Sequence, residues 1–219
     1  MHDLRTPLTS LIGYLDLLSQ HKYKDASTAD EYINIALKKS KRIQRLIEDL
    51  FTYTKLVNND INFDFEKVDI GTLVGQFIEE IKPNLNKINI ETDVVLPNED
   101  LLVLTDINQM LRVFENLFDN ISKYAKENTS VLVSIYESNK KAIIKITNET
   151  NLDLTSSVKL LFDRLYVSDE NRHNQSSGIG LSIVAEIIKL QGGIIYAKFN
   201  KPFLSIVIEL DVLENSSLY

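Results

Sequence analysis

Apolar residues recur at helical spacing through the first quarter of the chain. Leucines alternately four and three residues apart between positions 4 and 18 predict a helix that packs on other helices. A polar stretch at 21–26 interrupts this spacing, after which Ser27 or Thr28 is expected to cap a second helix that reaches Val57. Two such helices enclose a small core, so we expect two copies of the chain to form a four-helix bundle as a homodimer.

The hydrophobic period changes after residue 57. Alternation of apolar and polar positions predicts strands over 61–70, 88–96, 101–104, 131–136, 142–147, 194–199 and 203–210. Helical spacing predicts helices over 71–85, 106–124 and 179–190, the first ended by Pro83 and the second capped by Asp106. This order predicts an α+β chain, a helical hairpin followed by an α/β sandwich in which helices cover one face of a mixed sheet.

Charge and composition support two domains and narrow the class of protein. Residues 1–57 carry 9 basic and 7 acidic side chains, whereas residues 58–219 carry 15 and 24, so we place the domain boundary between them. The net charge of −7 argues against nonspecific binding to nucleic acid. The absence of cysteine excludes disulfides and thiolate chemistry, and three histidines leave little material for a histidine-rich metal centre. No stretch approaches the ~18 apolar residues of a membrane span, so we expect a cytosolic protein.

The sequence HDLRTPL at positions 2–8 is the first candidate for chemistry. A neutral imidazole is a nucleophile near pH 7, because its unperturbed pKa is about 6.5. Asp3 would hold the His2 ring in one tautomer, and Thr6 lies four residues after His2 on the same helix face. Taken alone, this pair is more simply a frayed chain end, so the interpretation depends on the motifs that accompany it.

Two further clusters carry groups suited to a nucleotide. Asn116, Asn120 and Tyr124 follow one another at intervals of four residues on one helix face, and a carboxamide oxygen is a hard ligand of the kind that Mg²⁺ takes. Gly178 and Gly180 stand at the start of a predicted helix, where backbone amides and the helix dipole favour an anion. Taken alone, the first cluster is more simply a solvated stripe, and the second is as readily a helix entry turn.

Together these runs resemble the motifs of the sensor histidine kinases of two-component systems. HDLRTPL resembles the phosphoacceptor box, NLFDN at 116–120 with KYA at 123–125 the Asn box, LFDRLY at 161–166 the Phe box, and GIGLSI at 178–183 the second glycine box. The motifs stand in the family's order, and the resemblance covers essentially all 219 residues. It implies a dimerisation and histidine phosphotransfer domain at 1–57 and an ATP-binding domain of the GHKL (Bergerat) type at 58–219.

The resemblance also implies roles for individual residues. His2 is the phosphoacceptor, Asp3 lies beside it, and Thr6 orients water for the reverse, phosphatase reaction. The implied cofactors are ATP and Mg²⁺, and the implied partners are a second copy of the chain and a response regulator whose aspartate receives the phosphoryl group from His2. The implied ATP site comprises Asn120 as the Mg²⁺ ligand, Lys123 at phosphate, Tyr124 against adenine, Phe162 and Arg164 in a lid, and Asn116, Asn148, Gly178, Gly180 and Leu181.

One departure from the family pattern concerns this ATP site. After the strand at 142–147 the family has Asp-x-Gly-x-Gly, whose Asp accepts a hydrogen bond from the adenine amino group. This chain has NETNL at 148–152, so Asn148 offers a neutral acceptor, and Thr150 and Leu152 replace the glycines. Members that resemble vancomycin-resistance sensor kinases tolerate Asn here. The alternative is a nucleotide-weak or catalytically silent homologue that acts as a dimeric interaction or phosphatase module.

The family also has segments before the phosphoacceptor that this sequence does not contain. Met1 directly precedes His2, where the family has a turn of helix and, further upstream, sensor and membrane segments. The resemblance therefore implies the cytoplasmic portion of a membrane-anchored protein, attached to the membrane only through a missing upstream segment. A chaperone or topoisomerase fragment with the same ATP-binding fold is a third interpretation, which the HDLRTPL run and the helical hairpin disfavour.

Overall fold

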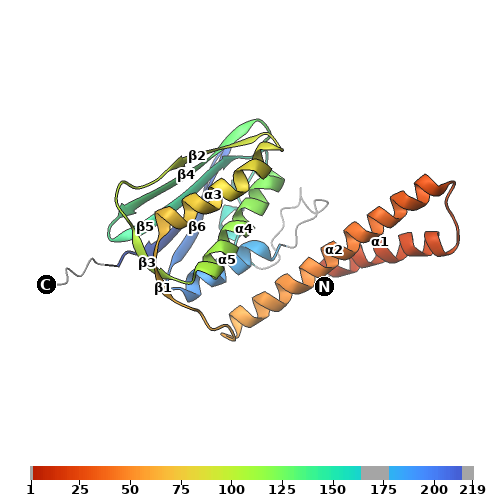
Figure 1. Cartoon of the computed structure of the whole chain (residues 1–219), viewed down its shortest axis with the longest axis horizontal. Coiled ribbons are helices and arrows are strands. Elements are labelled where there is room, and N and C mark those ends of the chain that lie inside the picture. Colours follow the sequence, from red (N-terminus) through yellow and green to blue (C-terminus); the bar gives the residue numbers. More distant parts are fainter. Residues whose placement is uncertain (1, 164–177, 214–219) are drawn as a thin grey trace. The chain divides into compact units, whose positions relative to one another are not determined.

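The computed structural model describes residues 2–163 and 178–213, with side chains from residue 5 onward. Its contacts divide the chain into two compact units, Met1–Lys55 and Leu56–Tyr219. The first unit is a helical hairpin in which α1 (His2–Ser19) lies beside α2 (Ala26–Val57) (Figure 1). Ala36 and Leu46 are buried within it, and the rings of Tyr14 and Tyr32 lie 5.4 Å apart.

Asp25 caps α2, so the prediction of a Ser27 or Thr28 cap is wrong. The Asp25 carboxylate accepts hydrogen bonds of 2.8 Å from both the backbone N–H and the hydroxyl of Thr28. These bonds, the backbone one foremost, hold the pKa of Asp25 below its ordinary value. The helix therefore begins at Ala26, and the predicted caps lie in its first turn.

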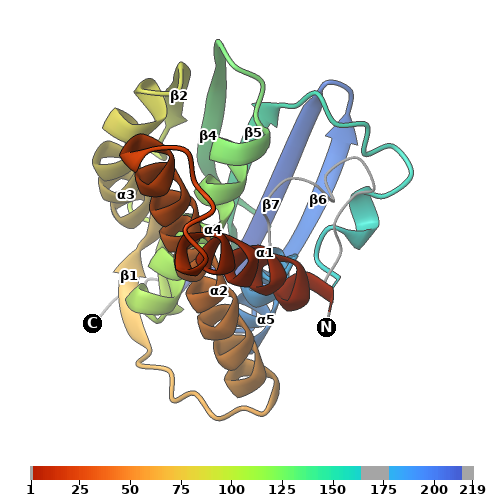
Figure 2. The same ribbon diagram turned by 90° about the vertical axis from the view of Figure 1, so that its right-hand side faces the viewer.

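The second unit is built on a five-stranded mixed sheet. Its strands, in spatial order, are β2 (Ile90–Val95), β4 (Thr129–Ser138), β5 (Lys141–Glu149), β7 (Phe203–Asp211) and β6 (Ile194–Asn200) (Figure 2). β2 and β4 are parallel, and the other neighbours are antiparallel. One face carries α3 (Ile70–Asn86), α4 (Ile107–Tyr124) and α5 (Gly180–Leu190) (Figure 1). The predicted fold class is confirmed.

The α4 helix is positioned by its cap and by its apolar face. Asp106 caps it as predicted, because its carboxylate accepts a 3.0 Å hydrogen bond from the Gln109 backbone N–H. Phe114 and Phe118 both lie 5.6 Å from Phe77 of α3, measured between ring centroids. Burial of this face fixes the rotation of α4 about its axis, so its asparagines are held at the edge of the core.

Two predicted element boundaries are wrong. The strand expected over 61–70 is only β1 (Glu66–Asp69), because its partner β3 (Leu102–Thr105) offers only four residues for pairing. The helix predicted over 71–85 is α3, Ile70–Asn86, so Pro83 lies inside its last turn and does not end it as predicted. The carbonyl that Pro83 leaves without a donor belongs to the exposed residue Glu79, while Leu85 is buried and stabilises the last turn.

Candidate functional site

The structure brings two of the predicted motifs, the Asn box and the second glycine box, into contact. A side chain at Gly180 would place its Cβ 2.8 Å from Oδ1 of Asn116, closer than real Cβ contacts allow. Asn116 is itself held, because its Nδ2 donates a 2.8 Å hydrogen bond to the Arg112 carbonyl. The start of α5 therefore approaches α4 at a point where glycine is the residue that fits.

Asn116 and Asn120 of α4 direct their amide nitrogens back to their own helix. Nδ2 of Asn120 donates a 2.9 Å hydrogen bond to the carbonyl of Asn116. The carboxamide oxygen of Asn120, bonded to the same carbon as this nitrogen but directed away from it, is then the atom offered to a ligand. Since Asn120 is half-buried and Mg²⁺ takes oxygen ligands, the residue fits the metal role implied for it.

The first turn of α5 offers backbone donors to an anion. Gly178 has φ of 63°, a left-handed conformation that favours glycine. Ile179 occupies the N-cap position without a side-chain cap, and the Ser182 hydroxyl donates 2.8 Å to the Ile179 carbonyl instead of accepting from an amide. The half-buried Leu181 lies in this turn. Backbone amides at a helix N-terminus suit a phosphate group.

Lys123 and Tyr124 lie at the other end of α4. The Lys123 ammonium is 3.8 Å from the Asp119 carboxylate, and both side chains are exposed. An exposed pair of this kind contributes little, so a phosphate group can replace Asp119 as the partner of Lys123. Tyr124 is half-buried, and its carbonyl accepts a 2.8 Å hydrogen bond from the Thr150 hydroxyl. The end of α4 is thereby joined to the end of β5.

Asn148 occupies the last inward position of β5. It follows Ala142, Ile144 and Ile146 on the buried face of the strand and is 7% exposed. Its Nδ2 donates a 2.9 Å hydrogen bond to the Glu149 carbonyl. The carboxamide oxygen therefore remains as the acceptor, which is the atom that recognition of an adenine amino group requires.

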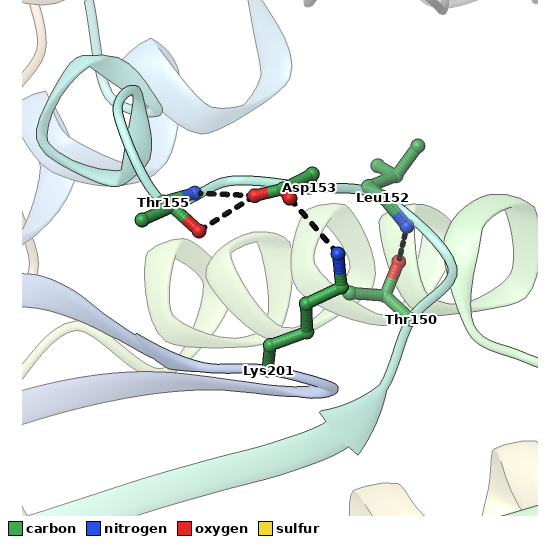
Figure 3. Close-up of polar contacts among 5 residues, drawn as sticks. All are labelled: Thr150, Leu152, Asp153, Thr155 and Lys201. Carbon is green, nitrogen blue, oxygen red and sulfur yellow. Dashed lines mark hydrogen bonds and ion pairs between the residues drawn. The ribbon is translucent and has the colours of Figure 1, made fainter.

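Thr150 and Leu152, which replace the family's two glycines, lie differently in the structure. Thr150 is 3% exposed, and its hydroxyl donates to Tyr124 and accepts a 3.2 Å hydrogen bond from the Leu152 backbone N–H. Figure 3 shows the Leu152 side chain pointing away from Thr150. The segment also contains a contact that sequence reasoning missed, a 2.9 Å ion pair between Asp153 and Lys201. These residues are 48 positions apart, so no local pattern could reveal the pair.

The remaining predicted residues lie elsewhere. Phe162 is half-buried just after the short 3₁₀ helix η1 (Val158–Leu160), and Arg164 and the rest of the predicted lid lie outside the described residues. His2 and Asp3 belong to the first turn of α1, but their side chains are not described. Thr6 is exposed on the same helix. These three residues belong to the hairpin unit and the ATP-site residues to the other.

Two further properties hold for residues 2–163 and 178–213. No helix there combines the length and the apolar character needed to cross a membrane. No three His, Cys, Asp or Glu side chains there converge on a point where a metal ion could bind. A metal at the α4–α5 site would therefore depend on Asn120 and on the phosphate oxygens of its ligand, which is how Mg²⁺ is commonly held beside nucleotides.

Comparison with known protein families matches both units. Residues 1–59 match the His Kinase A (phospho-acceptor) domain, and residues 105–213 match the Histidine kinase-, DNA gyrase B-, and HSP90-like ATPase. The chain is 29% identical over 214 residues to the sensor protein VanS of Enterococcus faecium, covering 97% of the chain and 55% of VanS. It is 32% identical over 199 residues to the signal transduction histidine-protein kinase ArlS of Staphylococcus aureus strain USA300, covering 90% of the chain and 44% of ArlS. The chain thus spans about half the length of these relatives.

Solved structures share the fold. The histidine kinase AdeS of Acinetobacter baumannii superposes with a TM-score of 0.79 at 22% identity, covering 97% of this chain and 98% of AdeS. The histidine kinase ThkA, solved in complex with the response regulator protein TrrA, superposes with a TM-score of 0.78 at 21% identity, covering 97% of this chain and 59% of ThkA. At these identities the likeness establishes the arrangement of the elements.

Proposed function

Because this chain belongs to the sensor histidine kinases of two-component systems, we propose that it binds ATP with Mg²⁺ and phosphorylates His2. The observation that carries the proposal is the contact between Gly180 and Asn116, which sets the backbone donors at the start of α5 beside the face of α4 on which Asn120, one turn further on, offers its carboxamide oxygen. A phosphate chain needs the donors, and its Mg²⁺ needs the oxygen. Both requirements are met on adjacent helices of one unit.

Each predicted ATP-site residue has a physical task in this proposal. Asn148 accepts from the adenine amino group, and Tyr124 lies against the adenine ring. Asn120 holds Mg²⁺ through its oxygen, Lys123 neutralises phosphate charge, and the amides of Gly180 and Leu181 bind phosphate oxygens. Asn116 and Gly178 support them, Asn116 by packing on Gly180 and Gly178 by turning the chain into α5. Phe162 and Arg164 would belong to the lid over the triphosphate.

The chemical step is proposed for the hairpin. ATP, bound with Mg²⁺, supplies the phosphoryl group. The neutral imidazole of His2 would attack the γ-phosphorus through Nε2 as the bond from that phosphorus to the bridging oxygen breaks and ADP leaves, while Asp3 would stabilise the positive charge that develops on the ring. Phosphoryl transfer depends mainly on positioning and charge neutralisation, which the ATP-site residues provide. His2 then passes the group to an aspartate of a response regulator, and Thr6 orients water in the reverse phosphatase reaction.

Nucleotide binding is the first test. Titration calorimetry of the chain with Mg²⁺ and a non-hydrolysable ATP analogue is expected to give micromolar-to-millimolar affinity that Asn120→Ala abolishes. Asn108→Ala is the matched control, because Asn108 is exposed in the first turn of the same helix. No binding by the unchanged chain would favour the alternative of a dimeric interaction or phosphatase module without kinase activity.

Transfer of label is the second test. Incubation with γ-labelled ATP and Mg²⁺ is expected to give an acid-labile, alkali-stable phosphoprotein in the unchanged chain and none in His2→Gln. Thr6→Ala is expected to retain labelling and to slow dephosphorylation of a phosphorylated response regulator. Label that persists in His2→Gln would place the phosphoacceptor elsewhere.

The hairpin has the surface that a homodimer would require. Large apolar side chains on both helices are exposed, among them Leu8, Leu15 and Ile47 at 46%, 49% and 55%. Leu8, Leu11, Ile43 and Ile47 also line a cavity of about 390 Å³ between α1 and α2. A second hairpin that packs on these residues would remove them from water and complete a four-helix bundle.

The dimer can be tested by a single charge. Ile47→Glu is expected to yield monomers in analytical ultracentrifugation, because burial of an unpaired carboxylate opposes association. Asn34→Glu adds the same charge at an exposed polar position of α2 and is expected to leave the dimer intact. A monomeric unchanged chain would contradict the proposal. We further propose that the chain is the cytoplasmic portion of a membrane-anchored sensor, as the coverage of VanS and ArlS allows.

A further inference from the structure

The loop after β5 is attached at two points to the same turn. Thr150 donates its backbone N–H to the Pro202 carbonyl at 2.9 Å, and Asp153 pairs with Lys201 at 2.9 Å. Lys201 and Pro202 form the turn between β6 and β7. Figure 3 shows Lys201 rising from this turn toward Asp153. The residues that replace the family's glycines and their neighbours are therefore held from outside the loop.

A third attachment joins this loop to α4. The Thr150 hydroxyl donates to the Tyr124 carbonyl at 2.8 Å, and the neighbouring Lys126 N–H donates to the Glu149 carbonyl at 2.9 Å. Tyr124 and Asn148 are the two residues proposed to contact the adenine. Thr150 thus fixes the spacing between the strand that carries one and the helix that carries the other.

Asp153 also organises the chain that leads to Phe162. Its carboxylate accepts hydrogen bonds from the Thr155 backbone N–H at 3.1 Å and from the Thr155 hydroxyl at 2.6 Å. These bonds and the one from Lys201 hold the pKa of Asp153 far below its ordinary value. Leu154, between the two residues, is 1% exposed, and its carbonyl accepts from Val158, the first residue of η1. The loop is thus ordered by side chains rather than by glycine turns.

We infer that Thr150, Asp153 and Lys201 are positioning residues that hold Asn148 and Tyr124, the residues proposed to contact adenine, in register with one another. The inference rests on the proposed ATP site and deepens it. Glycines allow a backbone to approach a ligand but do not hold it there. In this chain the Thr150 side chain is directed to α4, and the Asp153–Lys201 pair draws the remainder of the loop to the β6–β7 turn. These three residues act through Asn148 and Tyr124 and do not themselves touch the nucleotide.

The test compares affinities for Mg–ATP and for adenosine in the full chain. Thr150→Val keeps the β-branched shape and removes the hydroxyl, whereas Thr150→Ser retains it. Loss of one hydrogen bond corresponds to a decrease in binding affinity of about three- to tenfold. That loss is expected in Thr150→Val for both ligands, because Thr150, Asp153 and Lys201 position the residues that contact the base and not those at the phosphates. Thr150→Ser is expected to restore the affinity of the unchanged chain for both.

The ion pair is tested separately, on exposed side chains whose replacement is expected to leave the fold intact. Asp153→Asn keeps the acceptor for Thr155 but removes the charge, and Lys201→Met keeps the apolar stem. Each variant is expected to lower the affinity for both ligands by about two- to fivefold, which is within the range that an exposed ion pair contributes. The double variant is expected to lose no more than either single one, because the two charges act together. Lys82→Met, which removes an exposed pair with Glu79 on α3, is the control and is expected to change nothing.

The outcomes separate this inference from the proposed function. If the unchanged chain binds Mg–ATP and Asn120→Ala does not, the ATP site stands. If the variants at Thr150, Asp153 and Lys201 then bind both ligands as tightly as the Lys82→Met control does, the positioning role alone is overturned. A loss confined to Mg–ATP would also overturn it, because that would place the effect at the phosphates. An unchanged chain that binds neither ligand overturns the proposed function and this inference together.

Discussion

Restoring the family's aspartate at position 148 is expected to harm this protein. Nδ2 of Asn148 donates to the Glu149 carbonyl at 2.9 Å, and the side chain is 7% exposed. In Asn148→Asp the nitrogen becomes an oxygen without a hydrogen, so two acceptors face one another at that distance. A carboxylate that turns away from the carbonyl would lose the hydrogen bond and remain buried without a partner.

The magnitudes decide against the substitution. The lost hydrogen bond is worth about 0.5–1.5 kcal/mol, and a buried group left unsatisfied costs about 1–3 kcal/mol. A charged acceptor for the adenine amino group would gain only about 1 kcal/mol over a neutral one, since charged hydrogen bonds are roughly twice as strong. We therefore expect Asn148→Asp to lower the free energy of unfolding by about 1–3 kcal/mol and not to tighten ATP binding.

Thermal unfolding as a function of pH is the assay. At pH 7 a loss of this size lowers the melting temperature by about 2–4 °C per kcal/mol in a chain of this length. Burial and the facing carbonyl raise the pKa of the introduced carboxyl in the folded state above its unfolded value. The destabilisation is therefore fully present above the folded pKa and disappears as the pH falls from the folded pKa to the lower unfolded pKa, because the protonated carboxyl again donates to Glu149.

The control is Asn151→Asp, which introduces the same charge at an exposed position of the same loop. It is expected to melt within a degree or two of the unchanged chain at each pH, as surface substitutions do. Two results would refute the reasoning. One is an Asn148→Asp variant that binds ATP more tightly with unchanged stability at pH 7, and the other is a stability deficit that does not shrink in acid.

Three further predictions test the packing around the site. Gly180→Ala is expected to displace the Asn116 amide, which its Cβ would meet at 2.8 Å, and to weaken Mg–ATP binding in titration without loss of the folded state. Gly193→Ala would place its Cβ 2.7 Å from Leu210, so calorimetry should show a destabilisation of about 1–3 kcal/mol by overpacking. Asp69→Ala removes the cap of α3, and chemical denaturation should show a loss of about 1 kcal/mol. Burial raises the pKa of Asp69, but its hydrogen bonds, chiefly from Thr72, outweigh this and lower it. The loss should therefore vanish as the pH falls through that pKa, and a loss that persists in acid would contradict this account.

The sequence predicted the features that depend on local spacing. Asp106 stands where a helical pattern starts, so its role as the cap of α4 follows from residues within one turn. The turn at Gly192 has φ of 75°, as a glycine pair between a helix and a strand leads one to expect. The cap of α2 was misassigned by two or three residues, because Asp25, Ser27 and Thr28 are all competent caps and only the observed geometry separates them.

The features that escaped prediction depend on contacts between distant residues. The Gln191 side chain accepts hydrogen bonds from the Thr105 hydroxyl at 2.5 Å and from the Asp106 backbone N–H at 2.8 Å. This joins the end of α5 to the start of α4 across 86 and 85 positions of sequence. No periodicity encodes such a pair, since each residue taken alone is an ordinary polar residue at a helix end.

The residues at 148–153 that depart from the family pattern are physically linked. A comparison that treats each position separately does not reveal this link. The Glu149 carbonyl accepts from both Asn148 and Lys126, so the main chain is fixed at the point where the strand ends. Thr150, one residue on, fastens the chain to α4 and to the β6–β7 turn. An aspartate at 148 would oppose the Glu149 carbonyl, and a glycine at 150 would keep the backbone bond to Pro202 but lose the hydroxyl bond that joins the chain to α4. Asn148 and Thr150 therefore support the same backbone conformation. Restoring either family residue alone would remove one set of the hydrogen bonds that maintain this conformation and leave the other set in place.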